Sequence, residues 1–494
     1  MSQRRFTPLA LAAFGALLAP GWGADAATAS AQSAVPDRQP PVSWLTPCEA
    51  GAGGAWCGTY EVWENREARS GRRIGLNVRV IPAPTPTPAS DALVWLDGGP
   101  GGAATNSGPG LAQALADARA ERDLLLVDQR GTGGSNALDC PAPGPDDPLQ
   151  AHFGEFLPPD EVRACLAMQD ADVTQYTTPI AMDDLNEVRE ALGYDRLTLF
   201  GGSYGTRAAL IYMRRHPETV RAVALKGVAP TNMRNPLPFA RALEEGLSGV
   251  FDACAAEPGC AAAYPDLEGD WGRIAARFER GPVTATVTHE GRTEQVSIPK
   301  GVFADGVRHI LYTVNGSRTL PRMIAAGARG DFDEFAQREL QQSIGYANAL
   351  SLGMFLTVTC SEDLQFLTED EIRRETDGTF MGDYRIRRQL AACEIWGKGD
   401  VDASYSAPVT ADAPALLISG EFDTATPVAG ANWVAEYLPN SLHLVVPNES
   451  HGFRAGACEF GVISRFLGAG NAEGLDSSCL LETTRPAFET GGAR

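Results

Sequence analysis

A five-residue stretch, Gly201 to Gly205, constrains the fold of this chain more than any other. It reads Gly-Gly-Ser-Tyr-Gly, with an apolar run at 197–200 before it and a helix-like run at 206–213 after it. The order strand, sharp turn, helix places Ser203 at the tip of the turn. A residue there takes a strained backbone conformation, and the flanking glycines remove Cβ atoms that would clash. The stretch could also be a loop without chemistry, but its flanks favour a serine nucleophile presented between a buried strand and a helix.

Apolar runs that end in glycine-rich turns recur before and after Ser203. Such runs are typical of buried parallel strands whose loops gather at their carboxyl ends. Helical patterns alternate with them, which predicts an α/β fold with a mostly parallel sheet flanked by helices. A serine on a strand-to-helix turn in such a sheet is typical of the nucleophile elbow of the α/β-hydrolase fold. The predicted strands lie at 58–63, 74–81, 92–96, 124–127, 197–200, 220–225, 415–419 and 442–446.

The alternation of strands and helices stops at about residue 232. Long amphipathic patterns such as 239–254 follow, with one β-like piece at 283–298. Because 494 residues exceed one ordinary domain, an insertion or second domain is expected. We predict a large, mostly helical cap at 232–404, between a first part of the hydrolase core at 58–231 and a second part at 405–494.

The start of the chain predicts export. Two arginines precede an apolar run at 9–18, and an Ala-Asp-Ala site ends at residue 26. A basic start, a short apolar run and an A-x-A site are the parts of a secretory signal. The run is too short for a permanent membrane span. We expect a signal peptide at 1–26, a leader at 27–57, and a periplasmic or secreted protein without a membrane anchor after cleavage.

Ten cysteines in an exported chain predict disulfides. Sequence spacing favours five local pairs without fixing the connectivity: Cys48–Cys57, Cys140–Cys165, Cys254–Cys260, Cys360–Cys393 and Cys458–Cys479. No metal site is expected, because the chain has no C-x-x-C pair and its six histidines are scattered. The formal net charge of −21 argues against nucleic acid as a partner and favours solubility.

A serine hydroxyl needs a base to take its proton. In α/β-hydrolases the nucleophile is followed along the chain by the acid and then by a histidine after the last strand. His451 is the histidine in that place. The acid is expected just after the strand 415–419, where Asp423 is preferred to Glu421. We therefore predict a catalytic triad of Ser203, His451 and Asp423.

The oxyanion of the acyl-transfer intermediate needs two backbone N–H donors. One is expected from Tyr204, the residue after the nucleophile. The other is expected from the glycine turn after the strand 92–96, most naturally from Gly99, with Gly98 as the alternative. A phosphate-binding loop is disfavoured at this turn because no Gly-Lys-Ser/Thr follows it.

Four motifs together resemble the proline iminopeptidase family, and more closely its exported tripeptidyl-aminopeptidase branch. They are Gly98-Gly99-Pro100-Gly101, the stretch from Asp128-Gln129-Arg130-Gly131 to Ser135, the turn at 201–205, and the segment 420–427. The segments 254–265, 360–363 and 458–479 are also similar to that branch. The family's triad falls on Ser203, Asp423 and His451. Two positions depart from it: Asp97 stands where the family usually has histidine, and Lys226 where aspartate is common.

The resemblance implies an exported serine aminopeptidase, prolyl or tripeptidyl aminopeptidase-like, that hydrolyses peptide bonds near free N-termini and needs no cofactor. In the family an acidic group in the cap binds the substrate's α-amine by a charge-assisted hydrogen bond. Glu362 is the candidate for that group and Asp363 the second choice. The alternative is that both are ordinary exposed loop carboxylates.

Two other functions stay open at this point. An esterase or amidase acting on small acyl substrates is the main alternative, because one fold hosts both chemistries. A binding module on an inactive hydrolase scaffold is the other, and the complete set of predicted triad residues argues against it.

Overall fold

The computed structural model describes residues 38–48, 54–452 and 457–491. The predicted signal peptide, 1–26, and the start of the predicted leader lie outside the described residues.

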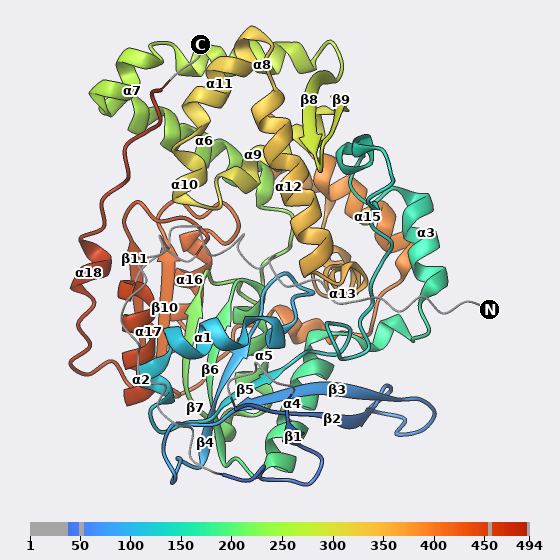
Figure 1. The fold of residues 1–494 in the computed structure, drawn as a ribbon, viewed down its shortest axis with the longest axis vertical. Coiled ribbons are helices and arrows are strands. Elements are labelled where there is room, and N and C mark those ends of the chain that lie inside the picture. Colours follow the sequence, from blue (N-terminus) through green and yellow to red (C-terminus); the bar gives the residue numbers. More distant parts are fainter. Residues whose placement is uncertain (1–37, 49–53, 453–456, 492–494) are drawn as a thin grey trace.

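A single large sheet organises the core (Figure 1). Its nine described strands follow the order β1-β2-β3-β5-β4-β6-β7-β10-β11. The pairs β1–β2, β2–β3 and β3–β5 are antiparallel, and the remaining pairs are parallel. The strands are β1 (Thr46–Pro47), β2 (Trp56–Trp63), β3 (Arg73–Ile81), β4 (Asp91–Leu96), β5 (Leu124–Val127), β6 (Arg196–Gly202), β7 (Val220–Lys226), β10 (Ala415–Gly420) and β11 (Ser441–Val446).

Helices cover both faces of this sheet, because successive residues of a strand point to opposite faces. In β4, Val94 and Leu96 pack with one apolar cluster, and Leu93 and Trp95 pack with the other. The first cluster includes α4 (Thr178–Leu192), α5 (Tyr204–Arg215) and α16 (Val428–Ala435). The second includes α1 (Gly108–Ala114), α2 (Ala116–Arg119), α17 (Ala457–Ala469) and α18 (Ser478–Leu481).

The elements between β7 and β10 build a cap with its own apolar core. In Figure 1 its helices gather at the top of the view, with the sheet below them. The cap core is rich in packed phenylalanines, such as Phe303 against Phe335 at 4.4 Å between ring centroids. Its elements are α6 (Phe239–Ala256), α7 (Pro258–Ala263), α8 (Leu267–Phe278), the hairpin β8 (Val283–His289) and β9 (Arg292–Ile298), α9 (Lys300–Ile310), α10 (Val314–Ser317), α11 (Leu320–Arg329) and α12 (Asp333–Ala349).

Two segments outside the predicted cap range also enter the cap core. Leu149 and Phe153 come from the turn η2 (Leu149–Phe153), which lies between β5 and α4, and Phe488 comes from the C-terminal tail. Conversely, Met354 of α13 (Leu352–Val358) and Trp396 of α15 (Tyr384–Trp396) pack in the apolar core of the sheet. Cap and core are therefore interwoven. The other elements of this stretch are α14 (Glu369–Thr376) and a π-helical turn, η5 (Thr359–Asp363).

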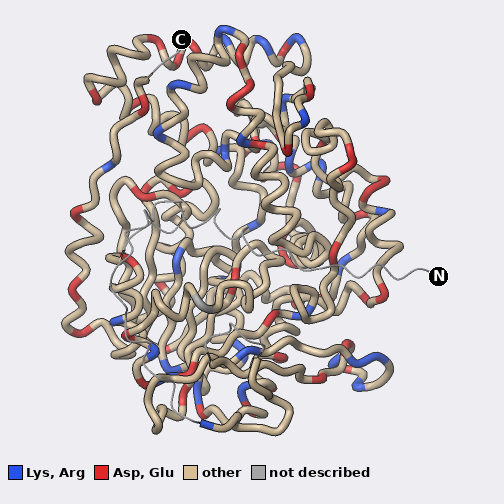
Figure 2. Tube along the Cα trace, viewed as in Figure 1, with Lys and Arg blue, Asp and Glu red and all other residues tan. Residues whose placement is uncertain are grey.

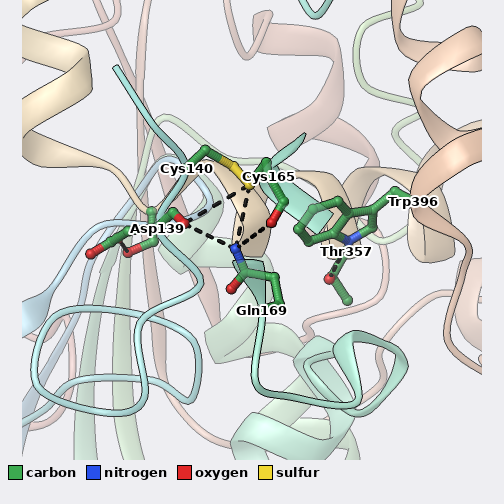
Figure 3. Close-up of a disulfide and its surroundings, with 7 residues drawn as sticks. Asp139, Cys140, Cys165, Gln169, Thr357 and Trp396 are labelled. Carbon is green, nitrogen blue, oxygen red and sulfur yellow. Dashed lines mark hydrogen bonds between the residues drawn. A yellow bond between two sulfur atoms is a disulfide. The ribbon is translucent and has the colours of Figure 1, made fainter. Parts of the chain in front are cut away.

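Five disulfides join Cys48–Cys57, Cys140–Cys165, Cys254–Cys260, Cys360–Cys393 and Cys458–Cys479, the pairs that spacing favours. Figure 3 shows Cys140–Cys165, which ties the loop after β5 to α3 (Pro159–Met168). Beside it, the Gln169 Nε2 donates to the carbonyl oxygens of Asp139 and Cys165, at 3.0 Å each. The bridge thus fixes a segment that packs near α13 and α15.

Acidic and basic side chains are interspersed over the molecule (Figure 2). Basic residues are visible on the turn between β2 and β3, whose Arg66 pairs with Asp184 and Glu187. Within the described ranges, no helix has both the length and the apolar character needed to cross a bilayer.

Candidate active site

Ser203 is the single residue between the end of β6 and the start of α5. Its backbone has φ +54° and ψ −124°, a conformation that non-glycine residues rarely take. A Cβ at Gly201 would overlap the Gly205 carbonyl, and one at Gly205 would overlap the Leu96 carbonyl. The Ser203 N–H donates to the Lys226 carbonyl oxygen at 2.9 Å, which fixes the turn against β7.

Two loops at the carboxyl ends of β10 and β11 bring Asp423 and His451 to this serine. The His451 Nε2 lies 3.0 Å from the Ser203 Oγ, and its Nδ1 lies 2.9 Å from the Asp423 Oδ2. With Nδ1–H donating to the carboxylate, Nε2 is free to accept the hydroxyl proton. The three predicted triad residues therefore lie in one hydrogen-bonded line.

Several donors keep Asp423 charged. The N–H groups of Ala425 and Thr426 each donate to Oδ1 at 2.8 Å, and the Thr426 hydroxyl donates to Oδ2 at 2.7 Å. Burial by itself would raise the pKa of Asp423, but His451, Thr426 and the charge of Lys226 together hold that pKa below its usual range. The carboxylate is thus available to orient the imidazole and to stabilise its protonated form.

The glycine turn after β4 lies against Ser203. A Cβ on Gly98 would stand 3.2 Å from the Ser203 Cβ, so a larger residue would crowd the serine. The Gly98 N–H donates to the Asp97 Oδ1 at 2.7 Å. Because that donor is engaged, we favour Gly99 over Gly98 as the partner of Tyr204 in the oxyanion hole. Burial raises the pKa of Asp97 to about 6, which the Gly98 N–H partly opposes.

The cap contacts the site at two places. At the first, the Tyr312 ring lies 5.1 Å from the His451 ring, and the Gly452 N–H donates to the Tyr312 carbonyl at 2.8 Å. At the second, the Ser351 N–H donates to the Gly101 carbonyl at 3.0 Å. Tyr312 was missed by the sequence analysis, since no motif surrounds it and only the packing of the cap brings it to the histidine.

Behind Tyr312 lies a cluster of buried charges. The Tyr312 hydroxyl accepts from Arg308, whose Nη2 donates to Asp305 at 2.9 Å. Arg385 pairs with the other oxygen of Asp305. The two guanidinium groups hold the pKa of Asp305 well below its usual range, although burial opposes them. These pairs fix the side of the cap that faces His451.

Glu362 and Asp363 are buried, so their interpretation as exposed loop carboxylates is wrong. Glu362 accepts from the Thr178 N–H at 2.6 Å, from the Thr178 hydroxyl at 2.8 Å and from the Tyr405 hydroxyl. Burial raises its pKa to about 7 against these hydrogen bonds. Asp363 pairs with Arg207 of α5 at 2.8 Å. Both carboxylates are tied to the elbow: Asp363 through Arg207, and Glu362 through Thr178, whose hydroxyl lies 2.7 Å from that of Tyr204.

The remaining candidates lie outside the line of the triad. Glu421 is exposed and accepts from the Asn448 N–H at 2.9 Å. His443 lies 3.0 Å from the Ser419 hydroxyl, and His216 lies 3.0 Å from Asp183. Within the described residues, no cluster of His, Cys, Asp and Glu side chains could hold a metal ion.

A serine on a strand-to-helix turn, in a mostly parallel sheet flanked by helices, defines a serine hydrolase of the α/β-hydrolase class. Residues 91–279 match the alpha/beta hydrolase fold family, and residues 378–479 match the TAP-like protein family. The chain therefore has the α/β-hydrolase fold, and its C-terminal part is similar to the TAP-like proteins. The resemblance to proline iminopeptidases and tripeptidyl aminopeptidases is confirmed by sequence relatives of both names.

The chain is 24% identical over 502 residues to the serine protease Hip1 of Mycobacterium tuberculosis, covering 91% of this chain and 93% of that protein. It is 27% identical over 193 residues to the tripeptidyl aminopeptidase of Streptomyces lividans, covering 35% of each. A proline iminopeptidase of Xylella fastidiosa is 33% identical over 93 residues, which cover 17% of this chain and 30% of that protein. The solved proline iminopeptidase of Mycobacterium smegmatis aligns with a TM-score of 0.35 and 19% identity, covering 84% of this chain and 98% of that one.

Proposed function

We propose that this protein is an exported serine aminopeptidase that hydrolyses peptide bonds near free N-termini. The observation that carries the proposal is the hydrogen-bonded line from Ser203 through His451 to Asp423. The names of the relatives, a serine protease and two kinds of aminopeptidase, support a peptide as the substrate. Five disulfides support an oxidising compartment, periplasmic or extracellular.

The geometry supports an acyl-enzyme mechanism. His451 takes the Ser203 hydroxyl proton as Oγ attacks the scissile carbonyl carbon, and the N–H groups of Gly99 and Tyr204 stabilise the oxyanion. His451 then gives the proton to the leaving amine as the C–N bond breaks. A water, deprotonated by the same imidazole, hydrolyses the acyl-enzyme. Asp423 stabilises the imidazolium in both halves of the reaction.

A panel of fluorogenic substrates tests the substrate class. We expect hydrolysis of peptide amides with a free N-terminus, and much weaker hydrolysis of the same peptides after N-acetylation. One-, two- and three-residue amides in the panel measure how many residues are released. If simple aryl esters or N-blocked amides were the preferred substrates, the esterase or amidase alternative would replace the proposal.

Glu362 is the proposed anchor for the substrate's α-amine. A carboxylate has about four acceptor sites, and the three donors on Glu362 leave capacity for a further one. Asp363 is the weaker candidate because Arg207 already neutralises it. Since the pKa of Glu362 is raised to about 7, amine binding should strengthen as the pH rises through that value.

The variant Glu362→Gln keeps the shape of the side chain and removes its charge. If Glu362 binds the amine, the kcat/KM ratio of free-amine to N-acetylated substrate should fall by about tenfold or more, the usual effect of losing a charge-assisted hydrogen bond. Equal loss on both substrates would leave Glu362 a structural residue and refute the anchor. Asp363→Asn is the matched comparison.

A further inference from the structure

Lys226 is a buried cation beside the active site that the mechanism above does not use. It ends β7, next to the elbow, and only 2% of its surface is exposed. Its Nζ lies 3.5 Å from the Oε1 of Glu459, a residue of α17 that is also 2% exposed. A buried ion pair is weak evidence for stability, since desolvating two charges offsets much of their attraction. The location of the Lys226–Glu459 pair beside the active site is therefore more informative than its contribution to stability.

Lys226 contacts the segments that carry two triad residues. Its carbonyl oxygen accepts from the Ser203 N–H at 2.9 Å, and its Nζ donates to the carbonyl oxygen of Ser450, the residue before His451, at 3.4 Å. The next residue, Gly227, lies so close to the imidazole that a Cβ there would stand 3.1 Å from the His451 Cε1.

The Lys226 segment also reaches the third triad residue. The Gly227 N–H donates at 2.9 Å to Ile418 of β10, the strand that leads to Asp423. The lysine charge acts on Asp423 as well, where it contributes to holding the pKa of that carboxyl below its usual range. One residue thus connects all three triad segments, by backbone, by side chain and by charge.

Several charges among the described residues share this environment. The charged and titratable groups that face His451 or its loop are Asp423, Glu421, Glu449, Tyr312, Lys226 with its partner Glu459 and, through Tyr312, Arg308, while Arg485 lines the same cavity as Glu449 and Ser450. Lys226 donates directly to the backbone of that loop. Removing its charge leaves the immediate surroundings of His451 more negative.

We propose that Lys226 is a positioning residue for the His451 loop, and that its ion pair with Glu459 sets the pH at which His451 can act as a base. The proposal rests on Ser203 being the nucleophile, as in the proposed function, but not on the substrate being a peptide. A positive charge near the imidazole disfavours protonation, so it keeps the base active at lower pH.

The test is the pH dependence of Ser203 labelling by a fluorophosphonate. In that reaction the Oγ–P bond forms, the P–F bond breaks, fluoride leaves and the hydroxyl proton goes to His451, so the rate needs an unprotonated imidazole but no particular substrate. In Lys226→Met we expect the acid limb of the rate profile to move up by about one pH unit. The doubly neutral variant Lys226→Met/Glu459→Gln avoids an unpaired buried charge, and should show a smaller shift in the same direction.

A second buried ion pair provides the control. Arg122 pairs with Asp91 at 2.7 Å, at the amino end of β4 and so at the far end of the sheet. Arg122→Met should lower stability without moving the acid limb. If the folded double variant were labelled with the wild-type pH profile, the inference would be overturned. If the wild-type protein were not labelled at Ser203 at all, the proposed function would fail as well.

Discussion

Gly205 carries the strictest steric requirement around Ser203. A methyl group at this position would overlap the backbone carbonyl of Leu96, which no side-chain rotation can relieve. We expect Gly205→Ala to lower the free energy of unfolding by about 3 kcal/mol or more, because the clash is with backbone. Denaturant unfolding followed by circular dichroism measures the change.

Gly272 provides the matched control for Gly205. It lies within α8 with open space around its would-be Cβ. There Gly272→Ala should raise stability by about 0.5–1 kcal/mol through its helix propensity. Equal effects of the two substitutions would contradict the steric account of the elbow.

The raised pKa of Asp97 should make the stability of the protein depend on pH. Its pKa is raised from 3.8 to about 6, so the folded protein retains a proton that the unfolded chain releases in that window. Stability therefore falls as the pH rises from 3.8 to 6. Asp97→Asn removes this loss and should stabilise the protein above the window by about 1–2 kcal/mol, discounted for partial exposure.

Thermal unfolding at acidic and neutral pH checks this prediction. The Tm gain of Asp97→Asn should be present at neutral pH and disappear at a pH below 3.8. The exposed Asp195 is the control, and Asp195→Asn should show no such dependence. A gain that is the same at both pH values would contradict the assignment.

Site residues that belong to a local motif could be predicted from the sequence. Ser203, Asp423 and His451 each follow a recognisable strand, and the structure brings them into one line. Tyr312 and Lys226 could not be predicted in the same way. Tyr312 reaches His451 because the end of α9 and the residues after it bond to the loops that follow β10 and β11. Lys226 was visible as a departure from the family pattern, but its partner Glu459 lies more than two hundred positions along the chain.

At the scale of elements, the sequence predicted strands better than helix limits. The predicted strand 124–127 coincides with β5, because a buried parallel strand is a sharply bounded apolar run. For α4, apolar periodicity predicts a helix only over 183–192, whereas the helix begins five residues earlier, at Thr178, with Pro179 in its first turn. Proline usually interrupts helices and strands, but it is favoured at the first positions of a helix. In the first turn of α4, the Thr178 N–H donates to Glu362, a long-range contact that local periodicity cannot reveal.

Two disulfides differ in what they should contribute to stability. Cys360–Cys393 spans 33 residues and joins η5, the turn that holds Glu362, to α15, whereas Cys254–Cys260 spans 6 residues. Since cross-linking a longer loop removes more chain entropy from the unfolded state, replacing the first pair by alanine should cost about 4 kcal/mol and the second about 2 kcal/mol.

Equilibrium unfolding in denaturant measures both double variants. Cys254, Cys260 and Cys360 are buried and Cys393 is partly buried, so cavity formation alone would not make the longer-loop variant the less stable one. A larger loss for Cys254→Ala/Cys260→Ala would contradict the loop-entropy argument.

At the scale of the whole molecule, the alternation of strands and helices predicted the α/β sheet and a mostly helical insertion within it. What it could not predict is how the insertion is used. Phe153 and Phe488, which lie outside the predicted cap, pack in the cap core. Met354 and Trp396, which lie inside the predicted cap, pack in the core of the sheet. These exchanges depend on contacts between residues far apart in sequence. In the same cap, Tyr312 packs against His451 and Ser351 bonds to the glycine turn after β4.

The proposed function depends on Ser203 being the catalytic nucleophile. The most direct measurement is the turnover of a free-amine peptide amide by purified Ser203→Ala, with circular dichroism and Tm confirming that the variant is folded. We expect a loss of about 10⁴-fold or more in kcat with an unchanged fold. Hydrolysis at the wild-type rate by the folded variant would contradict it.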